Sequence, residues 1–220
     1  MKKLISLSAA LLLSFNSFAG EVYSEFPTQI KPQEKYIFYS HGYIVEGDNP
    51  KPVNTKNGWG LYDFPAIKAA LADESYNLIA FHRSKNTDPY KYAYELNKQI
   101  RSLVAQGVDA KNITIMGFSK GAFITGLTSD KVSDLGVNTI LLAGCGRLVF
   151  KQHTDIKVYG RVLSIYEKTD KANTCKALKT KSTQAESFEE IAINTGLEHG
   201  AFYRPIPEWV KPVKRWIKAL

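Results

Sequence analysis

Residues 112–121 read NITIMGFSKG, and this stretch decides the fold that we expect around it. The apolar run NITIM predicts a buried strand. The pattern Gly-x-Ser-x-Gly, centred on Ser119, follows it directly and precedes a short helix. At such a strand-to-helix turn the serine is exposed, and the glycines leave room where side chains would clash. A serine hydroxyl is a weak nucleophile that needs exposure, a base and nearby backbone donors, so Ser119 is the predicted nucleophile.

Outward from this turn, short apolar runs alternate with amphipathic stretches. The runs that predict buried strands are residues 35–40, 76–81, 112–116, 138–143, 161–166 and 188–193. Helices are predicted from Asp63 to about residue 72, from Thr87 or Asp88 to Gly107, and over residues 207–220. Residues 22–30 form either a first strand or an irregular arm, and residues 45–59, rich in Pro, Gly and Asn, form a long loop.

This alternation predicts an α/β fold: a mostly parallel central sheet flanked by helices, in a single domain over residues 20–220. Binding and catalytic sites in such sheets lie at the carboxyl ends of the strands. The residues that follow each predicted strand are therefore the candidates for function.

The composition excludes several classes of protein. A hydrophobic fraction of 44% and a charged fraction of 23% are those of a soluble globular domain, not of a disordered chain. The net charge of +8 comes from lysines and arginines that are scattered apart from residues 211–218, so we expect a solvated surface and no nucleic-acid partner. Isolated histidines, and the absence of a phosphate-binding glycine loop, predict neither a metal nor another cofactor.

The first 19 residues have the pattern of a cleaved signal peptide. Lys2 and Lys3 precede an apolar run over residues 4–15, and Ser17 and Ala19 fit a signal-peptidase site with cleavage after Ala19. The alternative is a membrane anchor, but the run is shorter than the roughly 20 residues that a spanning helix needs. We therefore expect a secreted or periplasmic protein without stable membrane insertion, and predict no particular oligomeric state.

Cys145 and Cys175 are the only two cysteines, and both lie in the part expected to be exported. An even number of cysteines in an oxidising compartment favours one disulfide bond, with two buried thiols as the alternative. Such a bond would tie the loop after the strand at 161–166 to the turn after the preceding strand.

The motif at residues 117–121 after a buried strand, together with His41-Gly42 after an earlier one, resembles the α/β-hydrolase superfamily. In element order the resemblance covers residues 35–220 and is greatest to small, lid-poor esterases and dienelactone-hydrolase-like members. It implies a serine, then an acid, then a histidine along the chain. Of the four histidines, only His199 follows a late strand and lies in a loop, so it is the expected general base.

The acid should follow the strand at residues 161–166. Asp170 does so after a short turn, and it would hold the imidazole tautomer and stabilise the imidazolium. Glu167 lies even closer to the strand end and is a competitor, while Asp155 is a weaker one. The acid is thus expected to be Asp170, with Glu167 left open.

The oxyanion hole should consist of two backbone N–H groups, from Tyr43 after His41-Gly42 and from Lys120 after the nucleophile. The single glycine at residue 42 departs from lipases with a longer glycine run, which leaves the first donor less defined. His41 itself is interpreted as structural.

Further residues follow strands or are placed to shape a pocket. His82 and Arg83 follow one strand, Trp59 and Tyr62 are candidates for an apolar wall beside Tyr43, and Lys120 and Arg147 would favour an acidic substrate. Packing, surface exposure or a solvated charge explains each of them nearly as well.

Together these features predict a serine hydrolase that cleaves a small carboxylic ester or thioester through an acyl-enzyme on Ser119, in an open site with little or no lid. Two alternatives remain: a non-catalytic binding protein on the same scaffold, and an acyltransferase that uses the same triad.

Overall fold

The computed structural model describes residues 20–146 and 155–220. The expected signal peptide, residues 1–19, and Arg147 lie outside these ranges. In the described part of the chain, no helix combines the length and the apolar character needed to cross a membrane.

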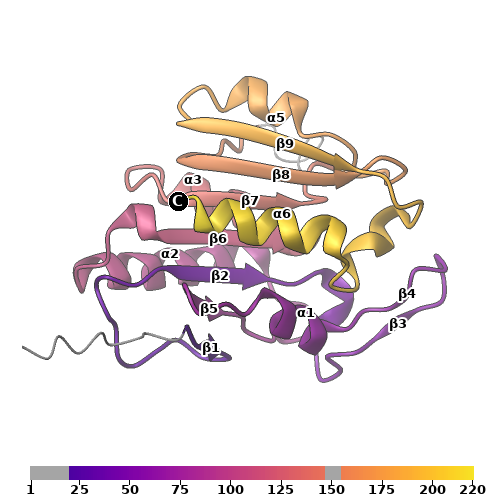
Figure 1. Ribbon diagram of the computed structural model, residues 1–220, viewed down its shortest axis with the longest axis horizontal. Helices are drawn as coiled ribbons and strands as arrows, with labels where there is room; N and C mark the ends of the chain where they lie inside the picture. The colour runs from indigo at the N-terminus through magenta and orange to yellow at the C-terminus, as the bar shows by residue number, and fades with distance from the viewer. Residues whose placement is uncertain (1–19, 147–154) are drawn as a thin grey trace, which may run out of the picture.

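A seven-stranded sheet forms the centre of the molecule, with strand order β1-β5-β2-β6-β7-β8-β9 (Figure 1). All six pairings between neighbouring strands are parallel. The strands are β1 (Val22–Tyr23), β2 (Tyr36–Ser40), β5 (Asn77–Ile79), β6 (Ile113–Phe118), β7 (Asn138–Leu142), β8 (Arg161–Glu167) and β9 (Ser187–Ile193). The mostly parallel α/β fold expected from the sequence is confirmed.

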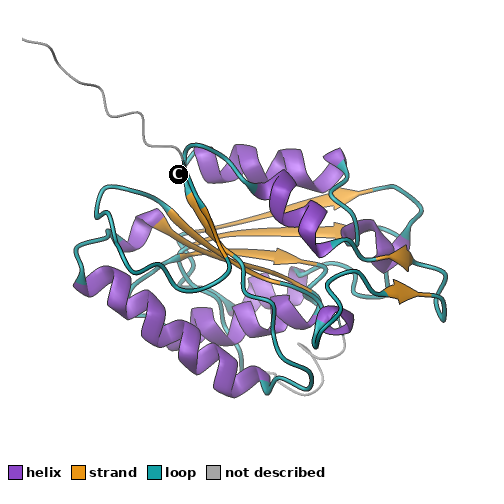
Figure 2. Ribbon diagram, turned by 90° about the horizontal axis from the view of Figure 1, so that it is seen from below, coloured by secondary structure: helices purple, strands orange, loops and turns teal. Residues whose placement is uncertain are grey.

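Helices cover both faces of this sheet (Figure 2). They are α1 (Phe64–Leu71), α2 (Pro89–Ala105), α3 (Lys120–Lys131), α5 (Lys176–Lys181) and α6 (Pro207–Lys218). The first two begin as the sequence predicts. The Asp63 carboxylate accepts a hydrogen bond from the Ala66 N–H, and the Asp88 carboxylate accepts from Tyr90 and Lys91. Helix α3 is longer than the short helix that we expected.

The core has two layers because alternate side chains of each strand point to opposite faces. On β2, Ile37 and Tyr39 pack with the inner faces of α1 and α6, whereas Tyr36 and Phe38 pack with α2 and α3. The five inner strands, β2 and β5 to β8, are therefore buried on both sides, which explains their nearly continuous apolar sequences.

Strand order reverses at the junction of β2 and β6. The chain leaves β2 through α1 toward β5 on one side, and the next strand, β6, pairs with the other side of β2. The loops that follow β2 and β6 therefore diverge, and a crevice at such a switch point is the usual binding site of an open parallel sheet.

Two segments differ from the sequence-based expectation, and a third, residues 22–30, is one that the sequence leaves open between a strand and an irregular arm. The long loop expected at 45–59 begins within a 3-10 helix, η1 (Tyr43–Val45). It includes strand β3 (Val53–Asn54), which forms a hairpin with β4 (Gly60–Leu61) directly after it. Helix α5 was not predicted, and of residues 22–30 only Val22–Tyr23 is a strand. All of these elements are too short to leave a periodic pattern of apolar residues.

Candidate active site

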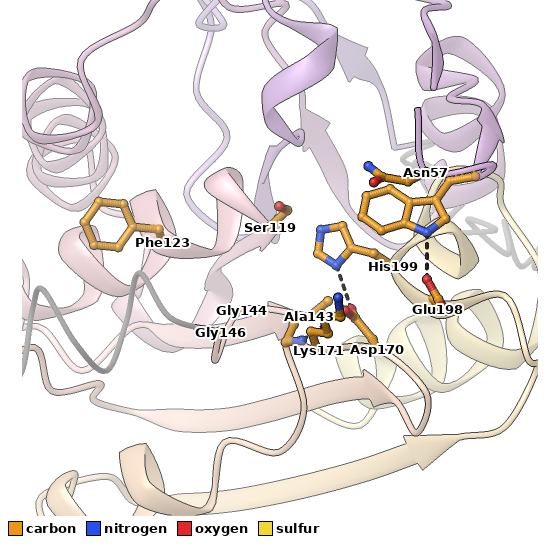
Figure 3. A pocket seen from close by; sticks show the side chains of 12 residues that line it. Asn57, Ser119, Phe123, Ala143, Gly144, Gly146, Asp170, Lys171, Glu198 and His199 are labelled. Atoms are coloured by element: carbon orange, nitrogen blue, oxygen red, sulfur yellow. Dashed lines mark hydrogen bonds and ion pairs between the residues drawn. The ribbon is translucent and has the colours of Figure 1, made fainter. Parts of the chain in front are cut away.

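Ser119 lies at the sharp turn between β6 and α3. Its backbone has φ 55° and ψ −116°, a conformation that a non-glycine residue adopts only under strain from its surroundings. Its side chain is partly exposed and lines a hollow of about 750 Å³ (Figure 3). The turn expected from the Gly-x-Ser-x-Gly pattern is therefore present, with the hydroxyl accessible.

The two glycines of the motif permit this turn because backbone approaches closely on both sides. A Cβ atom at Gly121 would lie 1.9 Å from the carbonyl oxygen of Ser40, at the end of β2. One at Gly117 would lie 2.3 Å from the backbone of Gly121. Since real Cβ atoms essentially never come within 3.0 Å of such neighbours, neither position accepts a side chain without a backbone shift.

His199 lies in the 3-10 helix η3 (Glu198–Phe202), which follows β9, and its Nδ1 is 2.6 Å from Oδ2 of Asp170. The Asp170 carboxylate is only 5% exposed, and its other oxygen accepts a hydrogen bond from the Ala172 N–H at 2.9 Å. Because a carboxylate accepts hydrogen bonds, Nδ1 is the nitrogen that carries the proton. Nε2 remains on the side of the ring where Ser119 lies (Figure 3).

The structure thus brings Ser119, His199 and Asp170 to one hollow from three separate strand ends, after β6, β9 and β8. The neighbouring carboxylate Glu167, left open by the sequence, does not contact His199. Its oxygens accept hydrogen bonds from Thr169, Thr195 and Gly196. Asp155 is exposed. The carboxylate that meets the imidazole is that of Asp170.

Aromatic rings fix the position of the imidazole. The centroids of Phe118 and Trp59 lie 4.7 Å and 5.1 Å from that of His199. The Trp59 indole N–H also donates to the Glu198 carboxylate at 3.1 Å. Trp59 comes from the β3–β4 hairpin, so the segment expected to be a loop supplies a wall of the site.

Two backbone N–H groups near Ser119 are candidates for the oxyanion hole, because Tyr43 shares a hollow with Ser119 and Lys120 follows it in the chain. Tyr43 and Lys120 are the first residues of η1 and α3, where N–H groups have no partner within the helix. The N–H of Gly42, in contrast, donates to the Tyr62 hydroxyl at 3.0 Å. The geometry is therefore compatible with the donors expected from the sequence.

The Lys120 ammonium group is bound within the protein and is not available to attract an acidic substrate. It lies 2.7 Å from a carboxylate oxygen of Glu46 and also donates to the carbonyl oxygen of Thr87 at 2.7 Å. The Glu46 side chain is 2% exposed and also contacts the buried Arg83. Arg147, the other residue considered for that role, lies outside the described residues.

His41 is structural, as expected. Its Nε2 accepts from the Arg83 N–H at 2.9 Å, so Nδ1 carries the proton and donates to the carbonyl oxygen of Gly42 at 2.8 Å. Burial, with a contribution from the Arg83 charge, lowers the pKa of His41 to about 2. The imidazole is therefore neutral and inaccessible. His82 and Arg83 also support this loop, since His82 lies 2.6 Å from the Val45 carbonyl oxygen.

Several residues that line the hollow were not singled out from the sequence. Ala143, Gly144 and Gly146 follow β7, and Asn57 lies in the β3–β4 hairpin. The rule that sites follow strand ends would have included the first three. Asn57 had no such signal. A second hollow, of about 310 Å³, shares Ser119 and His199 with the first and extends toward Tyr43.

The disulfide between Cys145 and Cys175 is present, with the Cα atoms 5.1 Å apart. Cys145 lies between two residues that line the hollow, and Cys175 follows the loop of Asp170. The bond therefore ties together the loops after β7 and β8, as the cysteine positions suggested.

No protein-family model and no curated protein sequence matches this chain. Solved structures do resemble it. A predicted CIB-like hydrolase from Thermoplasma acidophilum is 20% identical, with a TM-score of 0.53 over 84% of this chain and 87% of that one. The RedJ thioesterase of the prodiginine biosynthetic pathway in Streptomyces coelicolor is 10% identical, with a TM-score of 0.53 over 98% of both chains.

A thermostable esterase is 16% identical, with a TM-score of 0.54 over 88% of this chain and 57% of that one. At these identities the likeness concerns the fold. With the parallel sheet, the strained serine turn after β6 and the order of elements described above, the chain has the α/β-hydrolase fold.

Proposed function

We propose that this protein is a serine hydrolase that cleaves a carboxylic ester or thioester through an acyl-enzyme on Ser119. The observation that carries the proposal is the meeting of a strained, accessible serine with a histidine–aspartate pair in one hollow. Three structures of the same fold come from proteins named as a hydrolase, a thioesterase and an esterase, which supports the reaction class.

In the first half-reaction, Ser119 Oγ attacks the carbonyl carbon of the substrate while Nε2 of His199 takes the hydroxyl proton. The negative charge that forms on the carbonyl oxygen is stabilised by the N–H groups of Tyr43 and Lys120. Asp170 holds the ring through its bond to Nδ1 and stabilises the imidazolium. The bond to the leaving alcohol or thiol then breaks, and the leaving group takes the proton from Nε2.

In the second half-reaction, water takes the place of the leaving group. His199 removes a proton from the water as it attacks the acyl carbon, and the bond to Ser119 Oγ breaks. The proton returns to Oγ, which restores the free enzyme and releases a carboxylic acid.

The experiment is covalent labelling. A fluorophosphonate probe phosphonylates an activated serine, so the wild-type protein should be labelled and should hydrolyse short nitrophenyl esters. Ser119→Ala should abolish both. Unchanged labelling of Ser119→Ala would assign the reactivity to another residue, and a folded wild-type protein inert to the probe and to esters would favour the non-catalytic alternative. Product analysis with a competing alcohol would distinguish acyl transfer from hydrolysis.

We also propose that the protein is exported after removal of residues 1–19. The disulfide between Cys145 and Cys175 supports this, because disulfides persist mainly in oxidising compartments. The amino terminus of the protein recovered from culture medium or periplasm, read by sequencing, should be Gly20.

A further inference from the structure

Glu167, the last residue of β8, carries a fully buried carboxylate that the proposed reaction does not use. It lies three residues before Asp170 and pairs in the sheet with Ile193, the last residue of β9. The ladder between β8 and β9 ends here. After this point the segments that follow β8 and β9 are separate loops. The loop after β8 carries Asp170, and the loop after β9 carries His199.

The carboxylate of Glu167 bonds to both of these loops. Oε2 accepts from the N–H and the hydroxyl of Thr169, at 2.6 Å and 2.5 Å. Oε1 accepts from the N–H groups of Thr195 and Gly196, at 2.9 Å and 3.2 Å. Thr169 directly precedes Asp170, and Gly196 lies three residues before His199.

These four donors also explain how a buried carboxylate stays charged. Burial alone raises the pKa of Glu167, but the hydrogen bonds from Thr169, Thr195 and Gly196 outweigh it and hold the pKa below its usual value. An ionised carboxylate offers two oxygens that only accept, so each oxygen can hold one loop at the same time.

We propose that Glu167 is a positioning residue that fixes the Asp170 loop to the His199 loop and thereby sets the Asp170–His199 hydrogen bond. The inference rests on the proposed function for its catalytic consequence. The bond at issue is only 2.6 Å long and joins side chains from two different strand ends. Where the two loops separate, Glu167 adds a side-chain cross-connection to the backbone hydrogen bond from the Lys168 N–H to the Ile193 carbonyl oxygen.

The main test is Glu167→Gln, which keeps the size and removes the charge. The amide nitrogen of glutamine donates and cannot accept, so it must face either Thr169 or the pair Thr195 and Gly196, and one loop loses its backbone N–H bonds to this side chain. We expect kcat for a nitrophenyl ester to fall by about 10- to 100-fold with little change in KM, because a shift of about 1 Å in a catalytic group has effects of this size.

The decisive readout is the low-field proton signal of the His199 Nδ1–H, measured by NMR on the free protein. We expect this signal to shift or to broaden through exchange in Glu167→Gln. A merely structural role would lower Tm and leave the signal unchanged. Wild-type kcat together with an unchanged signal in Glu167→Gln would overturn the inference.

A matched control is Glu190→Gln, on β9. Glu190 also binds the acid loop, through the Thr174 hydroxyl and the Cys175 N–H, but it does not contact the His199 loop. We expect this variant to keep the wild-type signal and kcat even if Tm falls. If both variants lost kcat and the His199 signal equally, the cause would be a general loss of order in the loop that carries Asp170. That result would contradict the specific role of Glu167.

Two further outcomes are covered by additional variants. If Glu167→Gln does not fold, Thr169→Val removes only the hydroxyl donor from an exposed residue, and the His199 signal should move in the same direction by a smaller amount. No change in that variant would count against the inference. If Glu167→Gln is as inactive as Ser119→Ala while Asp170→Asn remains active, Glu167 is itself the triad acid and the positioning role is wrong.

The NMR readout needs no turnover, so failure of the two proposals can be distinguished. A wild-type protein that does not react with the fluorophosphonate probe would overturn the proposed function. The His199 signal in Glu167→Gln would still decide whether Glu167 positions the loops.

Discussion

The substitution Gly121→Ala tests whether close backbone contact sets the geometry of the site. The added Cβ would lie 1.9 Å from the Ser40 carbonyl oxygen and 2.6 Å from that of His41. Both clashing atoms belong to the backbone at the end of β2, so rotation of a side chain cannot relieve the clash. The start of α3 must move by at least 1.1 Å to bring the 1.9 Å separation to the 3.0 Å that real Cβ atoms keep.

This movement separates the two proposed oxyanion donors, because Lys120 moves with α3 while Tyr43 follows β2. We expect kcat/KM to fall by about 100-fold, the effect typical of a displacement of about 1 Å in an active site. The free energy of unfolding should fall by about 1–3 kcal/mol, the usual cost of overpacking a core. Ester hydrolysis and thermal unfolding measure the two effects.

Gly126→Ala provides the control on the same helix. Its Cβ would meet only the Ile156 side chain, at the ordinary contact distance of 3.4 Å. Replacing a helical glycine by alanine should stabilise the helix by up to about 1 kcal/mol, so activity should stay at the wild-type level and Tm should not fall. Wild-type kcat/KM in Gly121→Ala would refute the reasoning, since the contact would then not control the site. A loss of similar size in Gly126→Ala would refute it as well.

Three other predictions address the acid, the disulfide and the response to pH. Asp170→Asn should lower kcat by about 10³- to 10⁴-fold, because an amide no longer holds the Nδ1–H tautomer of His199; steady-state kinetics with a nitrophenyl ester measures this. Replacing Cys145 and Cys175 by alanine opens a loop of 30 residues and should destabilise the protein by about 3.6 kcal/mol, which calorimetry should record as a fall in Tm of about 7–14 °C. Burial raises the pKa of Asp73, but hydrogen bonds from Lys218, Ser75 and Lys214 outweigh it and lower the pKa well below its usual value. A carboxyl group whose pKa is lower in the folded state stabilises the protein above its unfolded pKa of about 4, and this stability is lost as the pH falls toward the folded value. Urea unfolding between pH 7 and pH 3 should therefore show a smaller acid-dependent loss in Asp73→Asn than in the wild type.

The sequence was sufficient to predict the strands of the sheet and the serine turn, because each of these is a local feature. An apolar run of strand length and a glycine pattern immediately after it can be recognised within ten residues. The identity of the acid was not local in this sense. Glu167 and Asp170 are three residues apart at the same strand end, and they differ in what lies opposite: backbone N–H groups for one carboxylate and an imidazole for the other.

The walls of the site were harder to predict than its centre. Asn57 and Trp59 reach the hollow from a hairpin whose strands have two residues each and pair only with each other. So short a pairing has no periodicity, and its position depends on tertiary contacts such as that between Trp59 and Gly200, where a Cβ would lie 2.9 Å from the Trp59 Cβ. The sequence singled out Trp59 as a candidate for an apolar wall, but it gave no signal for Asn57 or for the hairpin that carries both residues.

One structural feature recurs along the carboxyl edge of the sheet. Each pair of neighbouring strands that contributes to the site is joined by a contact beyond the regular pairing of its strands. The contacts are Gly121 against Ser40 for β2 and β6, the Ser119 N–H to the Leu142 carbonyl oxygen at 3.1 Å for β6 and β7, the disulfide for β7 and β8, and Glu167 for β8 and β9.

The last three contacts link the loop of Ser119 to that of His199 in series, and the first fixes the start of α3, next to Ser119. The position of His199 relative to Ser119 therefore depends on all four. A defect at any one should therefore displace the imidazole from the hydroxyl even where both side chains are intact. This explains why we expect substitutions as different as Gly121→Ala and Glu167→Gln to lower kcat, although neither removes a group proposed to react. It also predicts that the two effects are not additive when combined, because residues that act on one shared geometry couple energetically.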